Sequence, residues 1–331
     1  MSKPFVSIII ACRNEEKFIS KCLDSLIKQT YPKNKMEIFV VDGISEDKTR
    51  EIVKEYSKKN LFIYLLDNPK KITPVAFNLG IKNANGEIII IGSSHAVYKK
   101  DYIQKYTKYL DKCHADCIGG LQITIPTNNH LTTKAIALVL SCTFGVGNAL
   151  FRTGQSKKPK IVDTVPFACY RKNIFERIGL FNENLIRSQD MELNMRLKKA
   201  GGKIVLKPEV VGYYYPKSTL KEFFKHNFID GIWAIYPLKF VKIPLKIRHY
   251  IPLFFILSLL ISGIFGIFFP LFSWLFLFII ATYILFSLYF SINIAYNEKD
   301  IKYLFLMPIT FACRHFGYGI GSLIGLIKLT L

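Results

Sequence analysis

The feature that most constrains this 331-residue chain is a long run without a charged side chain, from Tyr250 to Asn297. Pro270 breaks the run near its middle, which leaves two segments of about 20 residues, the length at which a helix crosses a bilayer. Helices buried in a large soluble core usually keep a polar stripe, and these segments have none. The run therefore predicts a membrane hairpin, with a buried helical pair as the alternative.

A third apolar segment is also long enough to span a bilayer, but it carries Arg314 and His315 near its centre. Charges within hydrocarbon are costly unless they are paired or functional, so we leave open whether this segment crosses. Small residues permit close helix packing in membranes, and the segment contains Gly317, Gly319, Gly321 and Gly325. We expect two to three transmembrane helices, at about 250–270, 273–296 and 303–327.

The formal net charge of +21 could indicate nucleic-acid binding, since basic patches neutralise phosphates. No recognised nucleic-acid motif is present, so we expect no nucleic-acid partner. Positive charge beside a membrane span marks the cytoplasmic side and attracts anionic lipids. Such residues precede the first span at Lys217, Lys221, Lys225, Lys239, Lys242, Lys246 and Arg248. We predict an integral protein of the cytoplasmic membrane that contacts membrane lipids, with its large N-terminal domain in the cytoplasm.

The N-terminal part alternates short apolar strands with amphipathic helices. Strands are expected at 6–11, 38–41, 61–65 and 87–91, and helices between them. This alternation predicts an α/β fold with a mainly parallel, doubly wound sheet. In the first helix, Asn14 is placed to act as the N-cap, with Glu15 and Glu16 in the first turn.

Polar residues follow three of these strands at the point where each strand ends. Ala11 leads into Cys12-Arg13-Asn14-Glu15, Val41 into Asp42-Gly43, and Ile91 into Gly92-Ser93-Ser94-His95. Ligands of open α/β sheets bind outside the carboxyl ends of the strands. The sequence therefore predicts a nucleotide site at this edge.

The second half of the chain is harder to divide. The apolar region from Thr132 to Phe151 fits either a core helix or a loop against lipid, and we keep both possibilities. Leu220 to Tyr236 forms one apolar face opposite lysines, which is typical of a helix in the headgroup layer, although packing on the N-terminal domain is the alternative. We predict an N-terminal domain at 1–217, an amphipathic juxtamembrane region at 218–248 and a transmembrane region at 249–331.

Several segments, taken together and in order, resemble inverting family 2 glycosyltransferases with the GT-A fold, in particular the membrane-attached branch of succinoglycan and other exopolysaccharide enzymes. The segments are Val6–Glu16, Val40–Gly43, Pro74–Gly80, Val165–Phe167, Arg171 and Gln189–Glu192. The resemblance implies a GT-A nucleotide-diphospho-sugar transferase domain. It also implies that Asp42 hydrogen-bonds the nucleotide base. It further assigns to the nucleotide-sugar pocket Ala11, Arg13, Glu15, Lys71, Asn78 and Ser93.

The same resemblance makes Asp190 the catalytic base. Inversion at a sugar carbon requires the acceptor hydroxyl to lose its proton as it attacks opposite the leaving diphosphate, and a carboxylate within reach accepts that proton. Asp190 lies at the expected start of a helix, where the dipole favours its ionised form. On the acceptor side the resemblance gives Glu192, as a support for the acceptor or the loop, and Arg171.

The chain departs from the family at the metal site. Many relatives carry Asp-x-Asp after the fourth strand, and the exopolysaccharide branch often has Asp-Ala-His, whereas this chain has Ser93-Ser94-His95. His95 can still ligate a divalent cation. We expect a divalent cation, Mn²⁺ or Mg²⁺, with Mn²⁺ favoured because an imidazole replaces a hard oxygen ligand.

The Gln-x-x-Arg-Trp motif of processive synthases is absent, so we expect transfer of a single sugar. The predicted partners are a nucleotide-diphosphate-sugar donor and a polyprenyl-linked or growing polysaccharide acceptor. The alternative is a catalytically silent membrane scaffold of a polysaccharide assembly complex, which the loss of a carboxylate at Ser93 would favour. A dinucleotide-dependent oxidoreductase is disfavoured, because no Gly-x-Gly-x-x-Gly follows the first strand.

Overall fold

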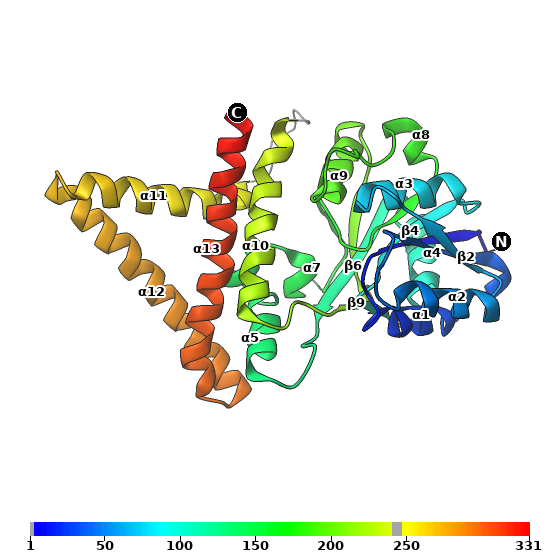
Figure 1. The fold of residues 1–331 in the computed structure, drawn as a ribbon, viewed down its shortest axis with the longest axis horizontal. Helices are drawn as coiled ribbons and strands as arrows, with labels where there is room; N and C mark the ends of the chain where they lie inside the picture. The colour runs from blue at the N-terminus through cyan, green and yellow to red at the C-terminus, as the bar shows by residue number, and fades with distance from the viewer. Residues whose placement is uncertain (1–2, 156, 240–246) are drawn as a thin grey trace. The chain divides into compact units, whose positions relative to one another are not determined.

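The computed structural model describes residues 3–155, 157–239 and 247–331 and contains two compact units (Figure 1). The sheet unit comprises residues 1–123 and 154–214, and the helical unit comprises residues 124–153 and 215–331. The helical unit therefore includes residues 124–153, a segment that the predicted continuous domain 1–217 had grouped with the sheet. Lys242 and Lys246, two of the predicted juxtamembrane cations, lie outside the described residues.

The first half of the sheet unit is the predicted alternation of strands and helices. Its elements are β1 (Val6–Cys12), α1 (Ile19–Ile27), β2 (Met36–Asp42), α2 (Thr49–Lys59), β3 (Ile63–Asp67), α3 (Thr73–Asn83) and β4 (Ile88–Ser93). The strands lie in the order β3-β2-β1-β4 and are all parallel. Every residue of β2 is buried, because helices cover parallel sheets on both faces.

The second half extends the sheet in the order β8-β6-β9-β5 beyond β4. Its elements are β5 (Ala96–Tyr98), α4 (Tyr102–Lys112), β6 (Cys117–Thr124), β7 (Lys160–Ile161), β8 (Cys169–Arg171), α8 (Ile174–Ile178), α9 (Gln189–Lys199) and β9 (Ile204–Tyr214). Strand β8 is antiparallel to both β4 and β6, and β5 is antiparallel to β9. The predicted α/β fold with a parallel sheet at its centre is confirmed.

The start of α1 differs from the prediction. The helix begins at Ile19, and its N-cap residue, Phe18, makes no side-chain cap bond. Asn14 has a left-handed backbone with φ 55°, and its side chain bonds to the loop after β2 instead of capping the helix. The segment 13–18 is consequently a loop at the end of β1, and this loop carries Glu15.

The helical unit combines three long helices near the C-terminus with shorter ones from the middle of the chain. Its helices are α5 (Leu131–Val139), α6 (Thr143–Val146), α7 (Leu150–Thr153), α10 (Leu220–Ile235), α11 (Ile251–Gly266), α12 (Pro270–Glu298) and α13 (Lys302–Thr330). Ile136 and Val139 of α5 are buried with Phe223 of α10 and Phe311 of α13 in one hydrophobic cluster. The region 132–151 is therefore largely helical and packs on the C-terminal helices.

Within the part of the chain that the structure describes, α12 is the one helix long and apolar enough to cross a membrane. The preceding apolar helix α11 has 16 residues. Helix α13 lies beside α10, and glycines allow the two backbones to touch (Figure 1). The carbonyl oxygen of Phe228 occupies the space where Gly321 would carry a Cβ atom, and the carbonyl oxygen of Tyr318 does the same at Gly231.

Candidate active site

The carboxyl ends of the four parallel strands lie side by side at one edge of the sheet. Asp67 of β3 pairs in register with Asp42 of β2, and Asp42 pairs with Cys12 of β1. Ala11, one residue earlier in β1, pairs with Ser93 of β4. The structure therefore brings together the strand ends from which the sequence predicted a nucleotide site.

Asp42 is completely buried and is held by the protein itself. One of its oxygens accepts the backbone N–H of Ser45 at 2.9 Å and Nη1 of Arg50 at 2.7 Å. Arg50 donates its other terminal nitrogen, Nη2, to Asp67 at 2.8 Å. A buried carboxylate is tolerated when it is paired and hydrogen-bonded in this way. The base contact predicted for Asp42 stays a prediction.

Sequence reasoning missed Arg50 and Asp67. The side chain of Asp67 is 57% exposed, whereas that of Asp42 is inaccessible, so Asp67 is the carboxylate of this network that a ligand can reach. A signal was present, because Asp67 ends an apolar strand as Asp42 does. Arg50 gave no such signal, since an arginine in the first turn of a helix is usually a solvated surface residue.

The loop after β1 is fastened to the loop after β2. Asn14 donates its N–H to the Ser45 hydroxyl at 2.9 Å, and Asn14 Oδ1 accepts the N–H of Glu46 at 3.0 Å. Glu15 donates its N–H to the Thr49 hydroxyl at 2.7 Å. These bonds fix the backbone of Glu15 at the strand-end edge, with its side chain available for other contacts.

His95, in the turn between β4 and β5, reaches the Glu15 side chain. His95 Nδ1 lies 3.2 Å from Glu15 Oε1, and the imidazole ring packs edge-on against Tyr214 at 5.2 Å. The described residues contain no cluster of three or more His, Cys, Asp or Glu side chains that could hold a metal ion. An imidazole beside a carboxylate is nevertheless a donor pair that fits a divalent first-row metal cation.

Two predicted donor-side cations border the same edge. Arg13 is partly exposed, lies against Gly43 and approaches the Glu46 carboxylate at 3.4 Å. Lys71 follows β3, is exposed and has a left-handed backbone with φ 58°. Long cationic side chains at this edge suit a phosphate-bearing ligand.

Asn78 of α3 is buried and joins the helix to a distant loop. Its Oδ1 accepts the N–H of Phe181 at 2.9 Å, and its Nδ2 donates to the carbonyl of Phe181 at 2.9 Å and to the Glu183 carboxylate at 3.1 Å. Hydrogen bonds from Asn78 and Lys70 hold the pKa of Glu183 below its usual value. Both polar atoms of Asn78 are thus used within the protein, and its predicted nucleotide contact stays a prediction.

Asp190 is exposed in the first turn of α9. Ser188, the residue before the helix, has a left-handed backbone with φ 61°, which turns the chain into the helix. The helix packs on β8, where the Tyr170 hydroxyl donates to Asn194 at 2.9 Å. Burial raises the pKa of Tyr170, and the charge of Asp190 contributes to this shift. Asp190 therefore lies near β8, the strand next to β4.

Glu192 is buried and supports a loop. It forms an ion pair with Arg196 one turn later, at 2.5 Å between Oε1 and Nε. Arg196 also donates to the carbonyl oxygens of Ile178 and, at 2.7 Å, of Leu180. Glu192 therefore holds Arg196 against the loop before the helix, and its predicted acceptor-side role stays a prediction.

Arg171 lies away from the strand-end edge. It pairs with Ile88, the first residue of β4, because β8 runs antiparallel to β4. Its guanidinium donates to Asp111 at 2.7 Å and to the carbonyl oxygens of Leu110 and Ala115. The side chain closes the C-terminal end of α4, and the acceptor-side role predicted for Arg171 stays a prediction.

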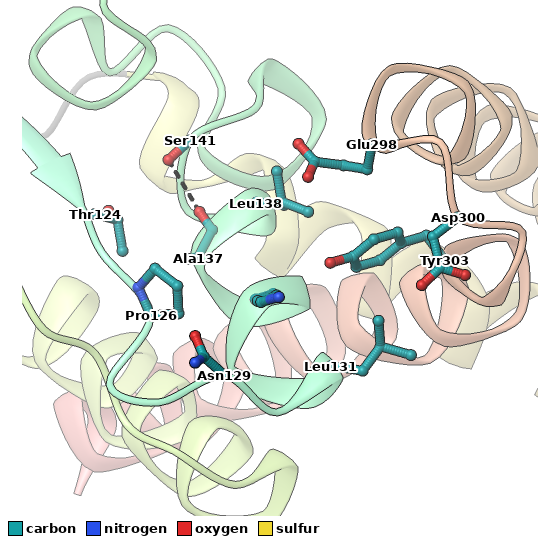
Figure 2. Close-up of a pocket in the computed structure, with 11 residues that line it drawn as sticks. Thr124, Pro126, Asn129, Leu131, Ala137, Leu138, Ser141, Glu298, Asp300 and Tyr303 are labelled. Atoms are coloured by element: carbon teal, nitrogen blue, oxygen red, sulfur yellow. Dashed lines mark hydrogen bonds between the residues drawn. The ribbon is translucent and has the colours of Figure 1, made fainter.

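A separate cavity of about 540 Å³ lies within the helical unit. Figure 2 shows the side chains of Asp300 and Tyr303 on one side and Asn129 and Ser141 among those on the other. None of the predicted site residues lines it. Sequence reasoning could not find this cavity, because segments far apart in the chain enclose it.

The sheet unit is an α/β domain whose strand-end edge carries several carboxylates, and the other unit is largely helical and apolar. The chain belongs to glycosyl transferase family 2, whose family model matches residues 7–179, and the predicted enzyme class is confirmed.

Similar proteins span most of the chain. A dolichyl N-acetyl-alpha-D-glucosaminyl phosphate 3-beta-D-2,3-diacetamido-2,3-dideoxy-beta-D-glucuronosyltransferase of Methanococcus voltae is 32% identical, with 98% of each chain covered. The succinoglycan biosynthesis protein ExoA of Rhizobium meliloti is 27% identical over 70% of this chain and 74% of its own.

Among solved structures, the mannosyltransferase PcManGT of Pyrobaculum calidifontis, in complex with GDP-Man and Mn²⁺, superposes with a TM-score of 0.61 and 16% identity. The match covers 98% of this chain and 88% of that one. At this identity the likeness shows the fold alone. The GT-A type of fold expected from the sequence is confirmed.

Proposed function

We propose that this glycosyltransferase transfers one sugar, with inversion, from a nucleotide-diphosphate-sugar to a polyprenyl-phosphate-linked saccharide at the cytoplasmic face of a membrane. The observation that carries the proposal is the register of the strand ends, which assembles Asp67, Asp42 and Ser93 at one edge beside Glu15 and His95.

On the donor side, the base binds at the ends of β2 and β3. Asp67 accepts an N–H of the base, and Arg50 holds Asp67 and Asp42 in place. A site that hydrogen-bonds a polar group of its ligand discriminates against ligands that lack the group. Arg13 and Lys71 lie at the same edge as cations for the diphosphate.

His95 and Glu15 would hold a divalent cation, with Mn²⁺ favoured, and the cation would supply positive charge to the departing diphosphate. The Glu15 carboxylate compensates for the acidic residue that Ser93 replaces. The fold neighbour that contains Mn²⁺ supports a cation in this type of fold.

Asp190 is the base. Its exposed carboxylate accepts the proton of the acceptor hydroxyl while that oxygen attacks the anomeric carbon, and the bond from that carbon to the diphosphate breaks on the opposite face. The position of Asp190 in the first turn of α9 favours its ionised form. Glu192 and Arg196 hold the loop before this helix.

Two observations support the proposal of a lipid-linked acceptor: the similar proteins and the apolar helices. The Methanococcus voltae relative is named for a dolichyl phosphate-linked N-acetylglucosamine, and its likeness extends through the C-terminal helices of this chain. Helix α12 is long enough to anchor the enzyme in a membrane. A lipid-linked acceptor is therefore presented to the enzyme at the bilayer surface.

The test is transfer by the purified full-length protein in nanodiscs. A panel of nucleotide sugars with Mn²⁺ and a short-chain polyprenyl-phosphate N-acetylglucosamine is incubated with the protein, and nucleoside diphosphate release and the anomeric configuration of the product are measured. One donor should give a disaccharide-lipid of inverted configuration. Retention of configuration would overturn the mechanism, and no product from any donor would favour the silent scaffold.

A further inference from the structure

Helix α10 and helix α13 pack tightly against each other, and α10 carries more charged residues than α13. Contacts run from Phe224 against Gly317 through Phe228 against Gly321 to Ile232 against Gly325. Along the same length α10 carries the ionisable residues Lys221, Glu222, Lys225, His226 and Asp230. Because ionisable side chains are costly within hydrocarbon, α10 cannot lie in the bilayer interior. Helix α13 packs along α10, and in a membrane-bound protein it would lie at the surface together with α10.

Arg314, near the middle of α13, lacks a carboxylate partner among the described residues. Its Nε donates to the carbonyl of Gly145 at 3.2 Å, and its Nη1 donates to the buried Oδ1 of Asn227. The guanidinium also lies 5.3 Å from the centre of the Tyr318 ring. A guanidinium has five N–H donors, so three of them have no partner within the described protein. These contacts aim the cation but do not neutralise it.

A second guanidinium, that of Arg248, is connected to Arg314 through Tyr318 and His249. Tyr318 approaches His249 Nδ1 through its hydroxyl at 3.4 Å, and Arg248 Nε lies 3.3 Å from His249 Nε2. Arg248 and His249 belong to the short 3₁₀ helix Ile247–His249 that precedes α11. On α10, Asp230 pairs with His226 at 3.3 Å. Tyr318 and His249 thus connect two guanidiniums, each of which carries a permanent positive charge.

We propose that Arg314 and Arg248 bind a phosphate group carried by a lipid, and that this phosphate is the one linking the polyprenyl chain of the acceptor to its sugar. Arginine forks match phosphate oxygens geometrically. A pair of helices at the headgroup level places these groups at the depth where lipid phosphates lie. The identification of the lipid as the acceptor rests on the proposed function, whereas phosphate binding itself does not.

Binding is measured without any transfer step, using full-length protein in neutral nanodiscs. The wild type should bind a short-chain polyprenyl phosphate and not the corresponding polyprenol. Arg314→Gln and Arg248→Gln should each raise the Kd by about 10-fold or more, the effect of losing a charge-assisted hydrogen bond. Lys302→Gln, which removes an exposed cation from the start of the same helix, should leave the Kd unchanged. Arg314 also bonds to Gly145 and Asn227, so loss of binding in Arg314→Gln alone would not distinguish a lost phosphate contact from misfolding. Arg248→Gln is included for this reason.

Two further arms separate the sources of the phosphate. If the acceptor is the ligand, both arginine variants raise the acceptor KM and leave the donor KM unchanged, and phosphatidylglycerol does not displace polyprenyl phosphate. Displacement by phosphatidylglycerol would retain the phosphate site but assign it to a membrane headgroup. Equal binding of polyprenol and polyprenyl phosphate, or an unchanged Kd in both arginine variants, would overturn the site. Failure of transfer in the wild type would overturn the proposed function and leave this binding result standing.

Discussion

Replacing Arg50 by Gln tests the claim that this residue stabilises the buried carboxylate at the strand-end edge. Arg50 contacts two carboxylates, of which Asp42 is inaccessible and Asp67 is 57% exposed. Removing one partner of a fully buried ion pair costs about 3–5 kcal/mol. The Arg50 side chain is 24% exposed, and water screens part of the interaction, so we expect a loss of about 3 kcal/mol.

Asp67→Asn is the matched control, because it removes the exposed half of the same network. An exposed pair contributes about 0.5 kcal/mol. At about 2–4 °C per kcal/mol for a unit of this size, Arg50→Gln should lower the Tm of the sheet unit by about 6–12 °C and Asp67→Asn by about 1–2 °C. Melting of the detergent-solubilised protein, followed by far-UV circular dichroism, measures both. Equal shifts would refute the reasoning, because they would mean that Arg50 does not compensate for burial of Asp42.

Three other predictions concern the loops around the site. His95→Ala should abolish the stimulation of transfer by added Mn²⁺, as EDTA does in the wild type, and full metal-dependent turnover in the variant would remove His95 from the cation site. Ile44 is a β-branched residue with φ 55°, so Ile44→Gly should stabilise the protein by about 1 kcal/mol in denaturant unfolding, and destabilisation would contradict this. Glu192→Gln leaves Arg196 without its buried partner; it should lower stability by about 2–3 kcal/mol with an unchanged donor Kd, and a weakened donor Kd at unchanged stability would argue for a direct contact.

The parallel half of the fold could be predicted from local pattern alone. Apolar runs such as Ile8–Ile10 and Ile88–Ile91 are buried on both faces of a parallel sheet, and the intervening helices carry one apolar face each. The strand-end position of Asp42 followed from the same pattern. These are short-range signals, because they depend only on residues that are neighbours in the sequence.

The parts that sequence reasoning missed depend on long-range packing. Asn14 has the residue type of a helix cap, but the loop after β2 offers its side chain a better partner. Arg171 lies at the opposite edge of the sheet from Ser93 because β8 runs antiparallel to β4. Residues 124–153 join the C-terminal helices because their apolar faces complete that cluster, as Ile136 does against Phe311. No local pattern encodes such a partner.

The most direct test of the account is single-turnover transfer by Asp190→Asn, with donor binding measured on the same preparation. The substitution preserves the shape of the side chain and removes its ability to accept a proton. We predict a transfer rate reduced by about 10²–10⁴, with a donor Kd within about twofold of the wild type, since Asp190 serves the acceptor and not the nucleotide. Transfer at the wild-type rate would contradict the assignment of Asp190 as the base and, with it, the proposed mechanism.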